Sequence, residues 1–309
     1  MAFINKSEIR IINLGRSGSH AVINWIMKLI PKKGCFLNNA KPHKNPFLSS
    51  TEKDIIGLDE KNFYKNNGEF TKKDLLMYSF EECDIKNLFN QSDEKLHDNF
   101  VGKSEKRYDV IILRDPFNFF ASRLKLEEYG IRSMDIHIID ERSKRLMMGY
   151  WKDYAKEFLG YTNYLKHNKV PISYNKWFSD ENYKKDIAKK LGLKYMYVED
   201  KYVSRYGPGS SFDKRKFDGK AKDMRVLERW KVFKDYPFYR GIFKDKEIWE
   251  LSGKIFGKIE GTEVLLKKQS FLKKALFSAK FLYIVLKGRA RYYTKKVIYL
   301  IFPIKAALS

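Results

Sequence analysis

The sequence contains little cysteine and no long apolar stretch. Cys35 and Cys83 are the only cysteines among 309 residues, which is too few for a disulfide framework and is consistent with a reducing compartment. No apolar run reaches the length of a membrane-spanning helix. Residues 1–7 are too short and too polar for a signal peptide. These absences predict a cytoplasmic protein.

Acidic residues are also scarce relative to basic ones. The chain has 38 Asp and Glu against 62 Lys and Arg, a formal net charge of +24 at pH 7. Such an excess favours an anionic partner, such as nucleic acid, an acidic glycan, a phosphorylated cofactor or an anionic lipid. No nucleic-acid motif stands out, so no specific nucleic acid is expected as a partner. His, Cys and Asp residues show no metal-ligand spacing, so no metal is expected either.

The chain is long and apolar enough to form a full hydrophobic core. Its hydrophobic content is 43% and its aromatic content is 16%, as expected of an ordered protein. Apolar segments separated by helical patterns predict an α/β fold, with a parallel sheet flanked by helices. The predicted strands contain Ile9, Cys35, Val110 and Pro171. Later helical patterns cover residues 141–168, 183–191, 224–233 and 246–256.

The first motif is a strand, a turn of small residues and a helix. Residues 9–14 are apolar and β-branched, as in a buried strand, and the turn Gly-Arg-Ser-Gly-Ser-His follows at residues 15–20. This arrangement aims backbone N–H groups and the positive end of a helix at a phosphate, and Gly18 allows a close approach. Ser19 and His20 can donate side-chain hydrogen bonds to the anion. The alternative is a tight strand-to-helix connection without a ligand.

The turn lacks the Lys of a nucleotide-kinase loop. The spacing Gly-x-x-x-x-Gly-Lys-Ser/Thr is absent, and Arg16 stands early in the turn, ahead of Gly18. A small P-loop kinase would also need an acidic residue at a strand end to hold Mg²⁺. Asp115 is the obvious candidate, but its neighbour Arg114 argues against a metal there. A kinase is therefore the weaker enzyme hypothesis.

A second motif follows another buried strand. After the apolar residues 109–113 come Arg114, Asp115 and Pro116, of which Asp115 suits a helix cap and Pro116 the first helical turn. Ser122 then lies within the helix. An Arg at a strand end and a Ser eight residues later can converge on one phosphate, with the Arg as a fork and the Ser as a donor.

Together the two motifs resemble those of the sulfotransferases that use 3′-phosphoadenosine 5′-phosphosulfate (PAPS). The family's first motif is similar to residues 16–20 and grips the 5′-phosphosulfate, and its second motif is similar to residues 114–122 and grips the 3′-phosphate. The resemblance implies a P-loop NTPase-like parallel sheet flanked by helices. It also implies cofactor contacts from Arg16, Ser17, Gly18, Ser19, His20, Arg114 and Ser122. Ala21 departs from the cytosolic small-molecule branch, which has a Trp there, so another group must hold the adenine.

Two later stretches are similar to further cofactor contacts of the family. Residues 170–174 predict a third buried strand, and the matching strand of the family ends in a Tyr that contacts adenine, a role that Tyr174 inherits. Tyr174 is alternatively a partly buried residue at a strand end. The Gly/Ser loop and the cations of residues 207–222 resemble the late basic segment over the 3′-phosphate, although the Arg-Lys-Gly triplet is absent. The contacts implied there come from Ser210, Ser211 and Arg215.

The resemblance implies sulfuryl transfer to a hydroxyl or amine, with Arg16 and His43 as catalytic residues. Arg16 would neutralise charge on the leaving phosphate. His43 follows the strand predicted at residues 34–37, where loops line the ligand crevice, and a His suits proton transfer near neutrality. His43 is alternatively an exposed polar residue, and the base would then be His97 or a carboxylate within residues 50–107. That polar range predicts a variable insertion over the acceptor site, or a mobile surface region.

Residues 268–309 differ in kind from residues 1–267, which are expected to form the sulfotransferase-like domain. The tail contains no acidic residue and interleaves Phe, Leu, Ile and Tyr with Lys and Arg. A basic amphipathic helix pair of this kind could lie on an anionic membrane surface, which predicts peripheral attachment at the inner membrane face. The alternative is a C-terminal helix that packs on the core and has a solvated basic face.

The acceptor is expected to be a saccharide or a glycolipid. The chain is polar and basic and shows no signature of an apolar pocket, which disfavours a steroid or phenol. A glycan or glycolipid made at the cytoplasmic face of a membrane would also give the basic tail a purpose. Besides the kinase, the competing hypothesis is a non-catalytic basic protein that binds nucleic acid or membrane through its tail.

Overall fold

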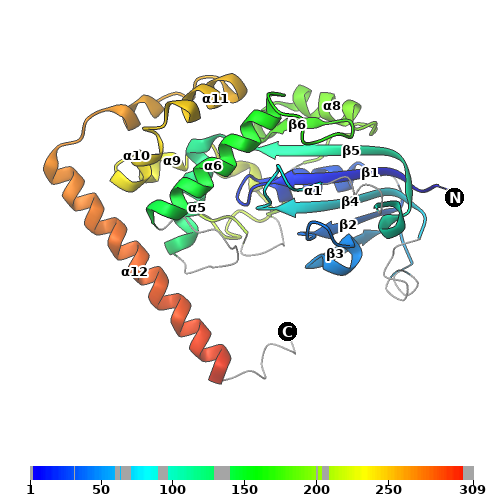
Figure 1. Cartoon of the computed structure of the whole chain (residues 1–309), viewed down its shortest axis with the longest axis horizontal. Coiled ribbons are helices and arrows are strands. Elements are labelled where there is room, and N and C mark those ends of the chain that lie inside the picture. Colours follow the sequence, from blue (N-terminus) through cyan, green and yellow to red (C-terminus); the bar gives the residue numbers. More distant parts are fainter. Residues whose placement is uncertain are drawn as a thin grey trace.

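The computed structural model describes residues 3–30, 32–59, 63, 71–89, 97–128, 140–199, 201–203 and 209–301. They form a mixed α/β structure around a six-stranded sheet with the strand order β3-β2-β4-β1-β5-β6 (Figure 1). The strands are β1 (Phe3–Asn13), β2 (Gly34–Asn38), β3 (Glu52–Ile56), β4 (Lys73–Glu81), β5 (Lys103–Leu113) and β6 (Val170–Ser173). All pairings are parallel except that of β2 with β3. The predicted α/β fold with a parallel sheet flanked by helices is confirmed.

The prediction that residues 50–107 form a variable insertion is wrong for β4. This strand lies between β1 and β2, so it is one of the central strands of the sheet. Most of its residues are buried, as expected of a parallel strand that is covered on both faces. Polar and charged residues flank the short apolar run in the sequence, and they hide its character as a core strand.

Helices cover both faces of the sheet and form two hydrophobic cores. One core packs α1 (Ser19–Lys28), α7 (Tyr174–Ser179) and α8 (Glu181–Lys190) against Ile9, Ile11 and Val110. The other packs α5 (Pro116–Glu128), α6 (Glu141–Phe158), α10 (Pro237–Ile242) and α11 (Lys246–Phe256) against Ile12 and Ile111. Side chains alternate between the faces along each strand, so neighbouring residues enter different cores. The shorter elements are α2 (Pro46–Ser49), α9 (Trp230–Phe233) and the 3₁₀ turns η1 (Ala221–Asp223) and η2 (Thr262–Leu266).

Two predicted helices are shorter than the sequence pattern suggested. The helix predicted over residues 141–168 begins with a capping box at Asp140 but ends at Phe158, and Gly160 then takes φ +77°. A left-handed Gly just beyond a helix is a common way to end it. Of the helix predicted over residues 224–233, only α9 forms. The helix predicted over residues 246–256 is confirmed as α11.

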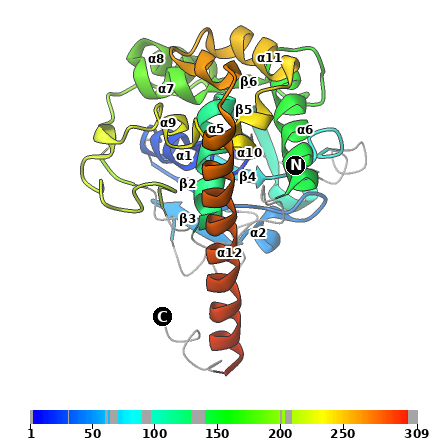
Figure 2. The ribbon, with the colours of Figure 1, turned by 90° about the vertical axis from the view of Figure 1, so that its left-hand side faces the viewer.

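The tail forms one long helix, α12 (Phe271–Ile301). The expectation of a helix pair is wrong, because the helix runs without interruption for 31 residues. It contacts α5 and α10, and it extends beyond the rest of the ribbon (Figures 1 and 2). Residues 302–309 lie outside the described part of the chain.

Candidate functional site

The turn at residues 15–20 connects β1 to α1 at the carboxyl end of a central strand. Arg16 and Gly18 both have positive φ angles, +73° and +82°. A side chain at Gly18 would collide with the Tyr174 ring, because a Cβ atom would lie 2.2 Å from its Cε2 atom. Arg16 bears a side chain in the same left-handed region, and strain of this kind is concentrated at functional sites.

The Arg16 side chain reaches the Gly/Ser loop that the sequence singled out. Its Nε donates to Ser211 Oγ at 2.9 Å and its Nη2 donates to the Gly209 carbonyl at 2.8 Å. Ser211 is 195 residues away in the sequence, so the fold brings the late loop onto the turn. Gly207 and Pro208, which belong to the same sequence pattern, lie outside the described residues.

The second motif joins this turn from the neighbouring strand. Arg114 is buried, and its Nη1 donates to Ser122 Oγ at 3.1 Å and to the Arg16 carbonyl at 3.3 Å. Its Nη2 donates to the Val226 carbonyl. The spacing of Arg114 and Ser122 therefore brings their side chains together, and both lie beside the first motif.

Arg229 is a site residue that the sequence analysis missed. It is 8% exposed, and it donates to Ser122 Oγ at 3.2 Å and to Ser210 Oγ at 2.8 Å. Arg215, which the sequence analysis chose from this region, is exposed. The burial of Arg229 next to Trp230, at the start of α9, is a property of the fold, and no local signal in the sequence separates Arg229 from the exposed cations nearby.

Arg16, Arg114 and Arg229, here called the arginine cluster, gather three guanidinium groups beside the turn. Burial and the neighbouring arginines together lower the pKa of Arg229 to about 9 and that of Arg16 to about 10, although Asp213 acts in the opposite direction on Arg229 and Glu81 on Arg16. Arg229 lies 3.6 Å from Asp213, but within the described chain Arg16 and Arg114 form no ion pair with a carboxylate. The Nε atoms of Arg114 and Arg229 lack a hydrogen-bond partner there.

Buried guanidinium groups with unmet hydrogen bonds are costly in an empty protein. A buried charge normally has a charged partner, and a buried polar atom normally has a hydrogen bond. An anion with several oxygens would supply both to the arginine cluster. The site therefore has the chemistry of a phosphate-binding site.

Glu81 is one of two carboxylates at the end of the strand beside the turn. It ends β4 and pairs with Asn13, three residues before Arg16. Burial and then the neighbouring Glu82 raise the pKa of Glu81 to about 7, although Arg16 and Arg123 act in the opposite direction. A carboxylate with this pKa is suited to accept a proton near neutrality. Glu81 lies within residues 50–107, where the sequence analysis placed the alternative base.

Glu82 and Arg123 hold the start of the turn. Arg123 Nη1 donates to Glu82 Oε1 at 2.6 Å and to the Gly15 carbonyl at 3.2 Å. The Gly15 N–H group donates to the same carboxylate oxygen. These two residues act on the site by positioning the backbone next to Arg16.

The other residues predicted in the turn face different surroundings. The Ser17 hydroxyl is buried and has no partner among the described residues, and Ser19 is the buried first residue of α1. His20 Nε2 lies 3.1 Å from Asn38 Oδ1, and burial lowers the pKa of its imidazole. A neutral His20 next to a phosphate would donate a hydrogen bond but would contribute no positive charge.

His43 and Tyr174 differ in how close the structure places them to the site. His43 follows β2 in a loop, is exposed and has φ +58°. Tyr174 begins α7 directly after β6, lies against Gly18 and has the Arg114 guanidinium 5.3 Å from its ring centroid. Tyr174 is thus part of the site, and the role of His43 as base stays a prediction.

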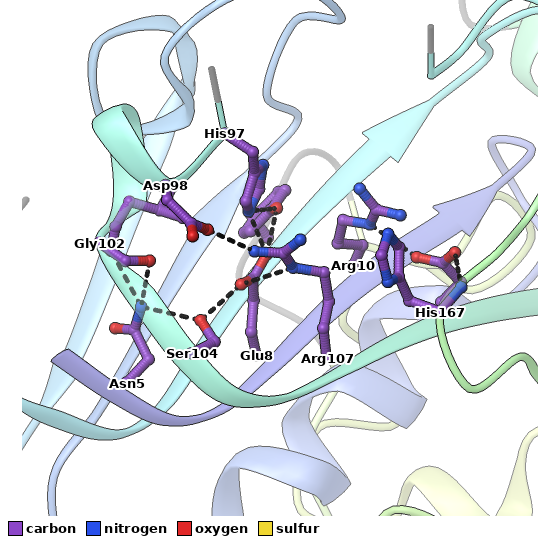
Figure 3. Close-up of polar contacts among 12 residues, drawn as sticks. Asn5, Glu8, Arg10, His97, Asp98, Gly102, Ser104, Arg107 and His167 are labelled. Carbon is purple, nitrogen blue, oxygen red and sulfur yellow. Dashed lines mark hydrogen bonds and ion pairs between the residues drawn. The ribbon is translucent and has the colours of Figure 1, made fainter. Parts of the chain in front are cut away.

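His97 belongs to a different network, shown in Figure 3. Its Nε2 lies 2.7 Å from Glu8 Oε1, and the same carboxylate accepts hydrogen bonds from Ser104 at 2.6 Å and Arg107 at 3.0 Å. Glu8 precedes Arg16 by eight residues of mostly extended chain, a separation of about 20 Å. His97 is therefore wrong as a candidate base.

The Asp115 carboxylate, which a kinase would use to hold Mg²⁺, is already engaged. It is fully buried and accepts hydrogen bonds from the side chains of Asn118 and Asn175. This arrangement caps α5, because Asp115 also accepts from the Asn118 N–H group at 2.8 Å. The local geometry gives Asp115 a structural role.

A pocket of about 400 Å³ adjoins the arginine cluster. It is lined by Phe178, Met224, Arg225, Val226, Leu227 and Glu228. The Val226 carbonyl accepts from Arg114, and the Phe178 ring stacks on that of Tyr174 with centroids 6.0 Å apart. The pocket thus opens beside the site and offers apolar side chains to a ligand that the arginines hold.

Comparisons with known proteins give limited information. No family model matches the sequence, and no curated protein matches it. Among solved structures, the chain is similar to mouse sulfotransferase SULT7A1 complexed with PAP, with 13% sequence identity and a TM-score of 0.42. The similarity covers 84% of this chain and 87% of that chain. A likeness this distant carries no functional argument, so the case for a function rests on the arginine cluster and the residues around it.

Proposed function

We propose that this protein is a sulfotransferase that moves the sulfuryl group of PAPS to a hydroxyl or amine of an acceptor. The observation that carries the proposal is the arginine cluster, in which the buried Arg114 and Arg229 and the half-buried Arg16 converge with the hydroxyls of Ser122, Ser210 and Ser211. Such a set of donors fits a ligand with two separate phosphate groups. PAPS has that property, with phosphates at both the 3′ and the 5′ positions.

The two motifs divide the phosphates between them. Arg114, Ser122 and Arg229 would hold the 3′-phosphate, because both arginines donate to Ser122 Oγ, at 3.1 Å and 3.2 Å. The N–H groups of residues 18–20 and the Ser19 hydroxyl would hold the 5′-phosphate at the start of α1. The adenine would enter the pocket beside Phe178 and Met224. This pocket would supply the apolar surface that the small side chain of Ala21 does not provide.

The chemistry needs positioning, charge neutralisation and a base. The acceptor oxygen or nitrogen attacks sulfur as the bond from sulfur to the bridging oxygen breaks, and the leaving group departs as adenosine 3′,5′-bisphosphate. Arg16 would neutralise the charge that develops on the bridging oxygen. Glu81 would take the acceptor proton, since its pKa of about 7 leaves it partly ionised at neutral pH. His43 is the second candidate for this step.

The acceptor that we propose is a saccharide or a glycolipid. The support is the polar and strongly basic character of the chain, which suits an acceptor rich in hydroxyl or acidic groups. A kinase is disfavoured, because the turn has no Walker-type Lys and Asp115 is engaged by two asparagines.

Transfer of ³⁵S from labelled PAPS tests the proposed reaction. The full-length protein should label a fraction of saccharides or glycolipids extracted from membranes, and Arg114→Ala should abolish the labelling. Transfer of ³²P from ATP and Mg²⁺ to the same extract is the matched control for the kinase. Labelling from ATP but not from PAPS would contradict the proposal.

A further inference from the structure

We propose that the outward face of α12 binds the surface of an anionic membrane. This inference is independent of the proposed chemistry. It starts from the way the helix is divided into two apolar faces, only one of which packs on the protein.

The inner face of α12 is anchored by aromatic contacts. The Phe277 ring packs on Tyr236 with centroids 5.1 Å apart, and the Phe281 ring stacks on Phe238 at 4.5 Å. Val285, one turn further along, is buried. Because these residues are spaced by four positions, they lie on one side of the helix and fix its orientation on the protein.

A second apolar stripe lies on the opposite side of the helix. At 100° per residue its members fall within an arc of about 120°, centred nearly opposite the packed face. The exposed fractions of these side chains are between 53% and 80%. The stripe consists of Leu272, Leu276, Leu282, Tyr283 and Leu286. Contiguous exposed apolar side chains of this size are unusual on a soluble surface and mark an interaction site.

Cations border this apolar stripe. On the same helical projection Lys280 and Lys287 lie along one edge of the arc and Arg289 lies along the other. Residues 268–309 contain no acidic residue, so nothing on the tail offsets this charge. An apolar stripe between cations matches an anionic bilayer, which offers acyl chains below negatively charged headgroups.

Charge decides between a membrane and a second copy of the chain. Two α12 helices placed face to face would bring their cationic borders together and repel each other, whereas anionic lipids attract both borders. No helix of the described residues is long and apolar enough to cross a bilayer. The geometry therefore fits a helix that lies along the surface.

The position of α12 would turn the arginine cluster toward the membrane. Figure 1 shows α12 at the end of the molecule to which β4 and β5 point, and Figure 2 shows it in front of α5, the helix that carries Ser122. Binding through α12 would then place the carboxyl end of the sheet near the lipid surface.

Co-sedimentation of the full-length protein with lipid vesicles tests this inference. The protein should bind vesicles of phosphatidylcholine mixed with phosphatidylserine, and it should bind pure phosphatidylcholine much more weakly. Lys280→Gln combined with Lys287→Gln should weaken binding to the anionic vesicles by about thirty-fold, since each basic residue near such a surface contributes about five-fold. Leu276→Ser combined with Leu282→Ser should weaken it more than ten-fold.

Matched controls separate this surface from general basicity and from misfolding. Lys189→Gln combined with Lys190→Gln removes two exposed lysines at the end of α8 and should leave binding unchanged. All variants should keep the wild-type melting temperature, because the substituted apolar residues are exposed. Equal loss of binding in the α8 control, or no binding by the wild-type protein, would overturn the inference. A dimer in sedimentation velocity that Leu276→Ser and Leu282→Ser abolish would assign the face to a second copy instead.

Discussion

Replacement of Arg229 by Met should stabilise the empty protein while it weakens ligand binding. Arg229 is 8% exposed and lies next to Arg114 and Arg16, which repel its charge. An arginine that serves only the fold should behave in the opposite way, since removing one partner of a buried structural pair costs about 3–5 kcal/mol. The sign of the effect on the empty protein therefore distinguishes an anion site from a structural arginine.

The magnitude follows from the lowered pKa of Arg229. Its change from 12.5 to about 9 means that the folded protein disfavours the charged guanidinium by about 5 kcal/mol at neutral pH. Because the folded pKa lies below the unfolded pKa, this penalty is fully present below about pH 9 and disappears as the pH rises toward 12.5. Met loses the hydrogen bonds to Ser122 and Ser210, at about 1–1.5 kcal/mol each. The empty variant should gain about 2 kcal/mol in the free energy of unfolding.

Urea unfolding with and without adenosine 3′,5′-bisphosphate measures both effects. At a ligand concentration about 1,000 times the wild-type Kd, the ligand should stabilise the wild-type protein by about 4 kcal/mol. Two lost charge-assisted hydrogen bonds should raise the Kd of Arg229→Met about 100-fold, which reduces this increment to about 1.4 kcal/mol.

Arg240→Met is the matched control. Arg240 is 7% exposed but donates to backbone carbonyls, among them that of Lys234 at 3.1 Å. This variant should lose stability, and the increment from the ligand should not change. The reasoning is refuted if Arg229→Met behaves like Arg240→Met, destabilised by several kcal/mol with an undiminished increment.

The site and the network in Figure 3 give three further predictions. Arg114→Ala and Ser122→Ala should each weaken the binding of adenosine 3′,5′-bisphosphate, measured by calorimetry. The Kd should rise about ten-fold to more than a hundred-fold, with Ser122→Ala at the low end. Unchanged affinity in both variants would remove the second motif from the site. Glu81→Gln should lower turnover about 10²–10⁴-fold and abolish the fall of kcat/KM on the acidic side of pH 7. A loss of turnover of this size in His43→Ala, but not in Glu81→Gln, would assign the base to His43. Burial raises the pKa of Glu8, but contacts with His97 and Arg107 outweigh burial and hold this pKa far below 4.5. The free energy of unfolding of the wild-type protein should therefore fall as the pH drops below about 4.5, and Glu8→Gln should reduce this dependence.

The sequence predicted the local parts of the site and missed the long-range ones. The strand-turn-helix of residues 9–28 and the pair Arg114 and Ser122 have a short-range signature, because their geometry depends on spacing along one segment. Arg229 meets Ser122 across 107 residues, and no spacing rule encodes such a contact. Exposed cations such as Arg225 and Lys231 stand close to Arg229 in the sequence, so composition did not distinguish it.

Glu81 was missed because β4 was missed. A carboxylate acquires a pKa near 7 from burial and from its neighbours, and both depend on β4 lying between β1 and β2. Parallel strands pair over long sequence separations, so the position of a strand in the sheet cannot be derived from its own residues. The two apolar faces of α12 show the same limit, since only the fold reveals which face packs on α10.

Calorimetric titration of the wild-type protein with three nucleotides tests the central claim most directly. Adenosine 3′,5′-bisphosphate should bind at least ten-fold more tightly than adenosine 5′-monophosphate, because only the former can engage Arg114, Ser122 and Arg229 with a 3′-phosphate. ATP with Mg²⁺ should bind no better than the monophosphate. Tight binding of ATP with Mg²⁺, or equal affinities for the bisphosphate and the monophosphate, would contradict the assignment of the arginine cluster to a 3′-phosphate.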